Sequence, residues 1–363
     1  MTIQRLLPRA CFRPPSTLAA AARRGFAIKS PFPPPFPTTP TCPAPTCPCE
    51  EAPKLPDGFT IDRVAPLNGV IPTYAQQVLV CTGHFTWPSK IEQGNSGDNL
   101  AADLKELVGA QGKYCDPFHN VMILNASFPS TPAPTRRPDL QTDSVYVLPL
   151  FKYVPFLPRI SFEHVEALVR AYLQPDALHP MYDTLSPVHR DRLLRKPVYE
   201  SILWGARDVE DVMVLICGHG NRDARCGIYG PVLRREFLDK LPGKGVEVLK
   251  GPVEVDEDDV DKPALDRPAE TGDGGKPTAR VALVSHVGGH KFAGNVILYM
   301  PPSMKLPNGE PHPLAGHGIW YGRVEPSHVE GIIEETILGG KVIEELFRGG
   351  IKRDGQGGEM LRI

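Results

Sequence analysis

The chain has 363 residues, a formal net charge of −2 and eight cysteines. Its near-neutral charge gives no indication of nucleic-acid binding, and its length predicts two or three domains, each with its own core. Eight cysteines in a chain this long are not typical of a disulfide scaffold and favour a reducing compartment or metal binding. No apolar run approaches the roughly 18 residues of a membrane-spanning helix, so we expect no membrane span.

The first 26 residues have the composition of a mitochondrial transit peptide. Six basic residues precede the first acidic residue, Glu50, and alanine, serine and leucine fill much of the rest. Arginine-rich, acid-poor leaders of this kind direct proteins to mitochondria, although a disordered basic tail has the same composition. Residues 24–27, Arg-Gly-Phe-Ala, also resemble a matrix-processing site. We therefore expect a transit peptide at 1–26 and a mitochondrial protein, with matrix and intermembrane space left open.

Residues 27–59 are rich in proline and predict a stiff, extended linker. This segment carries Cys42, Cys47 and Cys49. Three thiols could bind a metal, but no fourth ligand lies nearby in the sequence. We expect exposed linker cysteines.

A first domain is predicted over residues 60–180. Apolar runs at 76–81, 121–124 and 145–148 predict strands. Asp98 is a candidate N-cap for a helix with an apolar face, and Ser161 for a second one. The expected order is strand, helix, strand, strand, helix.

A second domain with the same order is predicted over residues 196–350. Strands are expected at 212–216, 281–284 and 296–298, with a helix whose first turn contains Pro231. Ser327 and Glu330 form a candidate capping box for the last helix. The acidic, glycine- and proline-rich stretch 256–276 is expected to be an insertion loop. The repeated order predicts an α/β protein with two tandem thioredoxin-like domains.

Four side chains in the second domain are candidate ligands for a metal. Cys217 follows a strand and Cys226 lies just before a predicted helix, while His286 and His290 flank a Gly-Gly pair on one short loop. The dipole of the helix lowers the pKa of a nearby thiol, which favours the thiolate that metals bind. The first domain has Cys81 and His84 but lacks a histidine pair, so we expect no such centre there.

Three metal centres fit these residue types to different degrees. Structural zinc accepts two cysteines and two histidines, but the nine-residue spacing of the cysteines is unlike that of zinc fingers. A Rieske centre would use Cys217 and His219, yet its second half requires a histidine where Tyr229 stands. The third is a [2Fe–2S] cluster with mixed ligands on a thioredoxin-like domain. His219 could bond a cluster sulfide or be an ordinary loop residue, and Arg222, Asp223 and Arg225 favour an ion-paired clamp of the loop.

Residues 211–232 and 281–300, together with the Trp-Tyr-Gly-Arg-Val-Glu-Pro run at 320–326, resemble the sucrase/ferredoxin-like family of fungal thioredoxin-like ferredoxins. The resemblance covers about residues 60–350. It implies a [2Fe–2S] cluster held by Cys217, Cys226, His286 and His290. Nothing in the chain indicates a paired-carboxylate glycosidase site, so the "sucrase" of the family name is not supported.

The expected function is therefore that of a mitochondrial electron-transfer protein carrying one cluster, not an enzyme. Its redox donor and acceptor would be proteins that the sequence does not identify. Two alternatives remain at this point: a zinc-stabilised structural or interaction module, and a thiol–disulfide oxidoreductase using Cys217 and Cys226. The absence of a Cys-x-x-Cys pair weakens the latter.

Overall fold

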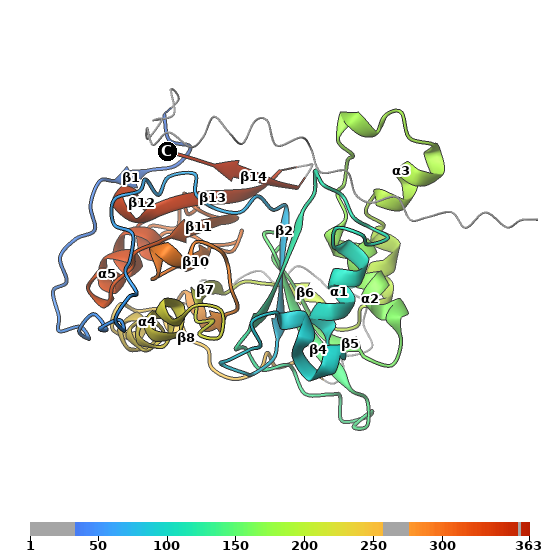
Figure 1. The fold of residues 1–363 in the computed structure, drawn as a ribbon, viewed down its shortest axis with the longest axis horizontal. Helices are drawn as coiled ribbons and strands as arrows, with labels where there is room; N and C mark the ends of the chain where they lie inside the picture. Colours follow the sequence, from blue (N-terminus) through green and yellow to red (C-terminus); the bar gives the residue numbers. More distant parts are fainter. Residues whose placement is uncertain (1–32, 257–275, 355–356) are drawn as a thin grey trace, which may run out of the picture.

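The computed structural model describes residues 33–256, 276–354 and 357–363. These residues form a mixed α/β structure built on one large mixed sheet of 12 strands (Figure 1). The predicted transit peptide 1–26 lies outside the described residues, as does nearly all of the predicted insertion 256–276. None of the helices in the described ranges is long and apolar enough to cross a bilayer.

The N-terminal half of the sheet has four consecutive strands in the order β3-β2-β4-β5. β2 is parallel to β3 and antiparallel to β4, and β4 is antiparallel to β5. Two helices belong to this half; α1 follows β2 and α2 follows β5. The elements are β2 (Gln76–Cys81), α1 (Leu100–Val108), β3 (Val121–Ala126), β4 (Thr142–Leu148), β5 (Lys152–Pro158) and α2 (Phe162–Leu168).

The C-terminal half repeats this arrangement in the order β9-β7-β10-β11. β7 is parallel to β9 and antiparallel to β10, and β10 is antiparallel to β11. The predicted repeat is therefore present, but each half has a fourth strand, β5 or β11, that the sequence analysis missed. The elements are β7 (Val212–Cys217), α4 (Ala224–Gly243), β9 (Thr278–Val284), β10 (Val296–Tyr299), β11 (His317–Tyr321) and α5 (Pro326–Gly331).

The two halves share one sheet because β3 and β9 pair antiparallel at Ala126 and Val284. The sheet is extended at one edge by β13 and β14 and at the other by β6, while β8 pairs with β9. The predicted α/β class is confirmed. Because one sheet runs through both halves, the prediction of two separate tandem thioredoxin-like domains is not confirmed. The remaining α-helix is α3 (Pro187–Leu193). The remaining strands are β1 (Thr38–Thr39), β6 (Arg207–Asp208), β8 (Glu247–Val248), β12 (Val342–Ile343), β13 (Phe347–Asp354) and β14 (Gly357–Leu361).

The capping residues explain where the helices begin. Asn99, one residue after the predicted Asp98, caps α1 by accepting a hydrogen bond from the Ala102 N–H at 3.0 Å. Ser161 caps α2 as predicted. α5 begins at Pro326, with Glu325 at the N-cap position, so the predicted capping box is displaced toward the N-terminus.

The buried apolar side chains form three clusters. On β7, Val214 and Ile216 pack on the side of α4, whereas Leu215 and Cys217 point the other way. This alternation follows from the two-residue period of a strand. The central cluster combines residues of both halves, among them Cys81 of β2 and both Cys217 and Cys226. The central core is thus where the two halves meet.

The proline-rich segment 36–50 packs on the C-terminal half. Thr38 and Thr39 form β1, which is parallel to β12, and Phe36 is buried with its ring 5.8 Å from that of Phe347. Cys47 is exposed, as expected for a linker cysteine, whereas Cys42 and Cys49 are half-buried, and all three are free. The domain boundaries predicted at 60–180 and 196–350 stay predictions.

Candidate functional site: a buried thiol pair

Cys217 is the last residue of β7 and is only 3% exposed. Cys226 lies in the first turn of α4 and is 1% exposed. α4 begins at Ala224, seven residues before the Pro231 that was predicted to lie in its first turn. Asp223 caps this helix by accepting a hydrogen bond from the Arg225 N–H at 3.1 Å. The cap brings Cys226 to the end of the strand that carries Cys217.

Glycine allows the helix to come this close to the loop that follows β7. A Cβ atom added to Gly227 would lie 2.5 Å from the Gly220 Cα, and one added to Gly230 would lie 2.7 Å from the Gly218 Cα. Both distances are shorter than real Cβ contacts, so a side chain at either position would push the helix away from the strand. The glycines around the two cysteines therefore serve close packing.

The two thiols have opposite protonation preferences. The pKa of Cys217 is lowered well below its ordinary value of 9.0, first by a hydrogen bond from Cys226 and then by hydrogen bonds from His286 and the Val287 N–H, which outweigh burial. The pKa of Cys226 is raised, because its thiol donates to Cys217 and is itself buried. The two shifts favour a thiolate at Cys217 and a thiol at Cys226.

Arg348 supplies positive charge near this pair. Burial lowers its pKa to about 10, and the charges of Cys217 and Cys226 oppose that shift. Its guanidinium donates to the Asn295 Oδ1 at 2.6 Å and to the Gly288 carbonyl at 3.3 Å. Sequence reasoning missed both Arg348 and Asn295, because Arg348 lies over 120 residues from Cys217 and no local pattern connects them.

His219 positions the histidine loop. Its Nδ1 accepts a hydrogen bond from the His286 N–H at 3.1 Å, and its Nε2–H donates to the carbonyls of Trp87 at 3.1 Å and Pro88 at 2.9 Å. These bonds fix a neutral tautomer, and burial lowers the pKa of the ring. His219 therefore ties a loop of the N-terminal half to the site in the C-terminal half, a role that the sequence left undecided.

His286 and His290 lie near each other but in different surroundings. Their ring centroids are 5.5 Å apart, and Gly288 and Gly289 between them have left-handed backbone, with φ of 88° and 72°. The His286 Nδ1 is buried without a hydrogen-bond partner. The side chain of His290 is 47% exposed, and its Nε2 lies 3.9 Å from Asp223.

Asp223 and Arg225 form an ion pair, as the sequence favoured, whereas Arg222 donates to the Ser89 Oγ at 3.5 Å. The Arg225 Nε and Nη2 lie 2.9 and 2.8 Å from the two carboxylate oxygens of Asp223. This pair lowers the pKa of Asp223 and orders the start of α4 beside His290.

The predicted electron carrier is corrected by this geometry. Within 33–256, 276–354 and 357–363, no group of three or more His, Cys, Asp or Glu residues is arranged to hold a metal ion. Cys217 and Cys226 are hydrogen-bonded to each other, and His290 is exposed and directed toward Asp223. The function predicted from a cluster on Cys217, Cys226, His286 and His290 is therefore wrong for this structure, and so is the zinc module. That these four residues are ligands, and that the cofactor is a [2Fe–2S] cluster, remain untested predictions.

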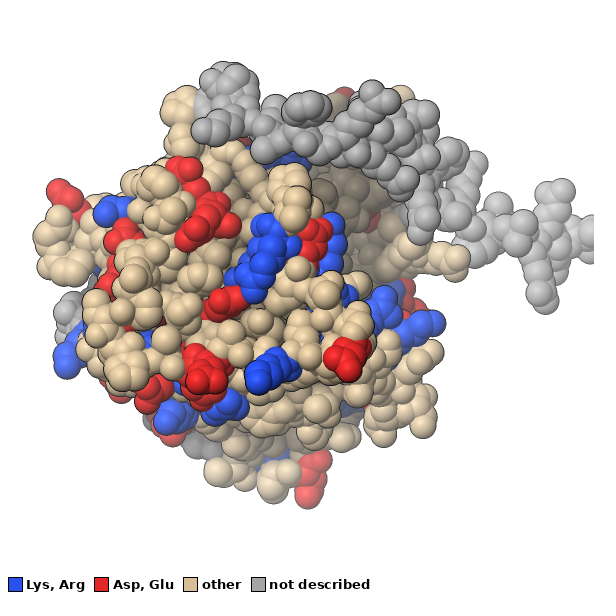
Figure 2. Space-filling view, turned by 60° about the vertical axis from the view of Figure 1, so that its left-hand side comes forward, with Lys and Arg blue, Asp and Glu red and all other residues tan. Residues whose placement is uncertain are grey.

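Charged side chains of both signs lie on the surface of the described residues. On the face in Figure 2, acidic and basic side chains are interspersed, and neither sign gathers into a large patch. This agrees with the near-neutral net charge.

Comparison with known proteins identifies the relatives of this chain. A family model described as sucrase/ferredoxin-like matches residues 67–349. Altered inheritance of mitochondria protein 32 of Debaryomyces hansenii is 29% identical over 84% of this chain and 92% of its own length. The protein of the same name from Meyerozyma guilliermondii is 27% identical over 85% and 94%. Actin patches distal protein 1 of Saccharomyces cerevisiae is 28% identical over 70% and 68%. No solved structure matches.

Proposed function

We propose, on the premise that this chain belongs to the sucrase/ferredoxin-like family, that it is a mitochondrion-associated thiol redox protein. Cys217 and Cys226 would interconvert between a dithiol and a disulfide. The observation that carries the proposal is the placement of two free, buried cysteines together, Cys217 at the end of β7 and Cys226 in the first turn of α4. The lowered pKa of Cys217 and the raised pKa of Cys226 agree with it. The mitochondrial part rests on the names of the relatives and on the composition of residues 1–26.

The division of protons between the thiols suits thiol–disulfide exchange. The thiolate is the attacking species, so a thiol of low pKa is the nucleophile of such a pair. Cys217 has this character because Cys226, His286 and the Val287 N–H all donate to its sulfur. Cys226 keeps its proton and serves as the second, resolving thiol.

The reaction balances as a two-electron exchange with a small disulfide. The Cys217 thiolate attacks one sulfur of that disulfide, forming a mixed disulfide and releasing one thiolate. The Cys226 sulfur then attacks Cys217, closing the internal disulfide and releasing the second sulfur of the small molecule, and the Cys226 proton ends on one released thiolate. The Cys217–Cys226 pair is oxidised while the small disulfide is reduced to one thiol and one thiolate.

Burial restricts the partners of this exchange. With Cys217 and Cys226 at 3% and 1% exposure, the loops 218–223 and 285–290 must separate before a disulfide reaches either sulfur. A low-molecular-weight disulfide needs a smaller opening than a protein disulfide does. We therefore assign the exchange to a small disulfide and leave any protein donor or acceptor unnamed.

Each half of the sheet is also proposed to be a thioredoxin-like unit. The support is the shared strand order, in which the second strand lies beside the first, followed by the third and the fourth. In both halves the first two strands are parallel and the last two antiparallel. A strand, a helix and three further strands before a closing helix match the core of that fold.

The test combines disulfide mapping with metal analysis. Protein purified without oxygen is treated with oxidised glutathione, digested, and mapped by mass spectrometry with and without dithiothreitol, and iron and acid-labile sulfide are measured on the same sample. The proposal predicts a reversible Cys217–Cys226 disulfide and no stoichiometric iron. Two irons and two sulfides per chain, with neither cysteine oxidisable, would contradict it. Cys81→Ser is the control variant and should leave the result unchanged.

A further inference from the structure

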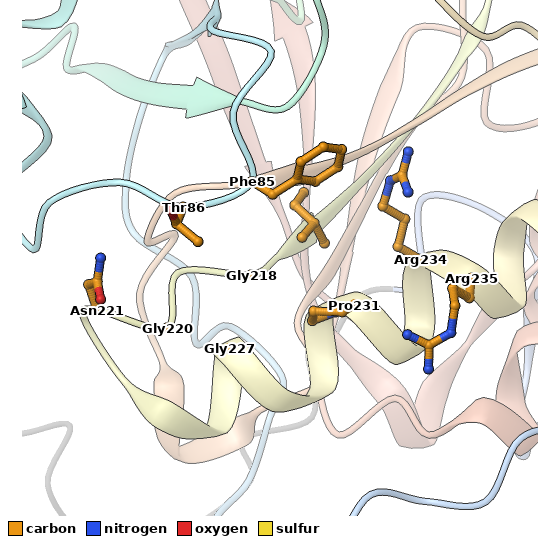
Figure 3. A pocket seen from close by; sticks show the side chains of 10 residues that line it. Phe85, Thr86, Gly218, Gly220, Asn221, Gly227, Pro231, Arg234 and Arg235 are labelled. Carbon is orange, nitrogen blue, oxygen red and sulfur yellow. The ribbon is translucent and has the colours of Figure 1, made fainter.

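A cavity of about 410 Å³ lies beside the loop that follows β7 and the first turns of α4 (Figure 3). We propose that it binds a small organic anion, whose carboxylate or phosphate group pairs with Arg234 and whose apolar body packs against Phe85, Pro231 and Leu283. Its volume falls within the range of about 300–1,000 Å³ that is typical of small-molecule sites.

Arg234 is the main reason to expect an anion. Its guanidinium is half-buried, and burial lowers its pKa. In the part of the chain that the structure describes, no carboxylate pairs with it, and its Nε is buried without an acceptor. Among the described residues, its close partner is the ring of Phe85, 5.1 Å away. A buried charge without a counter-charge is costly, so an anion at this point would offset the loss of hydration.

The neighbouring Arg235 differs from Arg234 because a carboxylate pairs with its guanidinium. Its Nε and Nη2 lie 2.9 and 2.7 Å from the two carboxylate oxygens of Glu50, and this pairing raises its pKa. Arg234 and Arg235 are adjacent on α4 and both line the cavity. Only Arg234 keeps its charge available for a ligand.

The shape of the cavity comes from residues that leave space. Gly218, Gly220 and Gly227 line it without side chains, and Phe85, Pro231 and Leu283 supply apolar walls. Phe85 is 49% exposed, so its ring is accessible to a ligand in the cavity. The combination of one charged group and apolar walls favours an anion attached to an apolar body.

This site is separate from the thiol pair, and the proposal goes beyond the redox function. Leu283 belongs to the apolar cluster on the α4 side of the sheet, whereas Cys217 and Cys226 belong to the central cluster. A ligand in the cavity would contact Gly218 and Gly227, each of which directly follows one of the cysteines. It would not contact either sulfur in this structure.

The test uses three probes that share one apolar chain. Binding of octanoate, octyl phosphate and 1-octanol to the full protein is measured by titration calorimetry. We expect at least one of the two anions to bind at least about tenfold more tightly than 1-octanol, since an ion pair in a partly buried site is worth about that much. The stronger of the two anions tells whether the headgroup is a carboxylate or a phosphate.

Variants connect the binding to Arg234. Arg234→Gln should weaken the anions about tenfold and leave 1-octanol unchanged, while Arg190→Gln on α3 should change nothing. Phe85→Ala, at a half-exposed position, should weaken all three probes. Equal binding of octanol and the anions, absence of binding, or an Arg234→Gln variant that folds and binds normally would each overturn the proposal. Inorganic phosphate that binds as tightly as octyl phosphate would overturn the role of the apolar walls.

Discussion

Cys81 and Cys217 occupy the same place in the two halves of the sheet, each as the last residue of the first strand. Both are buried in the central cluster. Yet burial raises the pKa of Cys81, with a further contribution from Asp143, whereas the pKa of Cys217 is lowered. Burial alone therefore makes a thiol inert, and hydrogen-bond donors around the sulfur decide whether it becomes a thiolate.

The two halves supply different donors at matching positions. Ser127 follows β3 and Ser285 follows β9, and each accepts a hydrogen bond at 3.0 Å from a backbone N–H of the other half. After these equivalent serines the halves diverge, because His286 follows Ser285 and Phe128 follows Ser127. α1 also begins without a cysteine where α4 carries Cys226. The scaffold is shared, and two side chains, His286 and Cys226, distinguish the surroundings of Cys217 from those of Cys81.

Substituting the equivalent cysteines should give the largest contrast. Cys217→Ser removes the nucleophile, so oxidised glutathione should no longer produce an internal disulfide at Cys226. Cys81→Ser leaves the Cys217–Cys226 pair intact and should oxidise like the wild type. Non-reducing peptide mapping measures both. A variant at Cys81 that loses the disulfide, beside a Cys217 variant that keeps it, would reverse the comparison.

The same two cysteines should affect the pH dependence of stability in opposite ways. Cys217 has a folded-state pKa below its ordinary value of 9.0. Between these two pKa values the unfolded chain binds more protons than the folded chain, so the contribution of Cys217 to the free energy of unfolding grows as pH rises toward 9.0. Cys81 has a raised folded-state pKa. Above pH 9.0 the unfolded chain releases its proton first, so the contribution of Cys81 to the free energy of unfolding is lost there. Urea unfolding of Cys217→Ser and Cys81→Ser across pH, each compared with wild type, measures the two slopes. Parallel curves for both variants would show that the thiols titrate alike.

His219 and His84 offer a matched pair of histidines in the two corresponding loops. His219→Ala removes the bonds to Trp87, Pro88 and His286 and should lower the free energy of unfolding by about 2–3 kcal/mol. His84 is exposed, so His84→Ala should stay within about 0.5 kcal/mol of wild type. Urea denaturation at neutral pH compares them. Equal values for the two variants would remove His219 from its bridging role.

The two serines that brace the halves should be equivalent. Ser127→Ala and Ser285→Ala each remove the acceptor of a buried backbone N–H, at Leu283 and Asn125 respectively. Each should cost about 1–2 kcal/mol, and the two values should agree closely because the bonds are related by the repeat. Thermal or urea unfolding tests the symmetry. If one substitution lowered the free energy of unfolding strongly and the other had no effect, the two hydrogen bonds would not be equivalent.

The repeat could be predicted from the sequence because strand and helix periodicity are local. The fourth strand of each half was missed, since β5 contains two prolines and β11 begins with His-Gly, both untypical of strands. The four candidate site residues could be found from their types and spacing. The sequence could not predict how these residues are protonated, that His290 is exposed, or that Arg348 lies near the pair, because all three depend on contacts between distant parts of the chain.

The central claim is that Cys217 carries a thiolate while its counterpart Cys81 does not. The ultraviolet absorbance of thiolates reports this without requiring a reagent to reach a buried sulfur. Titrations of wild type, Cys217→Ser and Cys81→Ser give the absorbance of each thiolate by difference. We predict that the Cys217 signal is already present well below pH 9.0, whereas the Cys81 signal is absent up to pH 9.0. A Cys217 signal that appears only near pH 9.0, as for an ordinary thiol, would contradict the account.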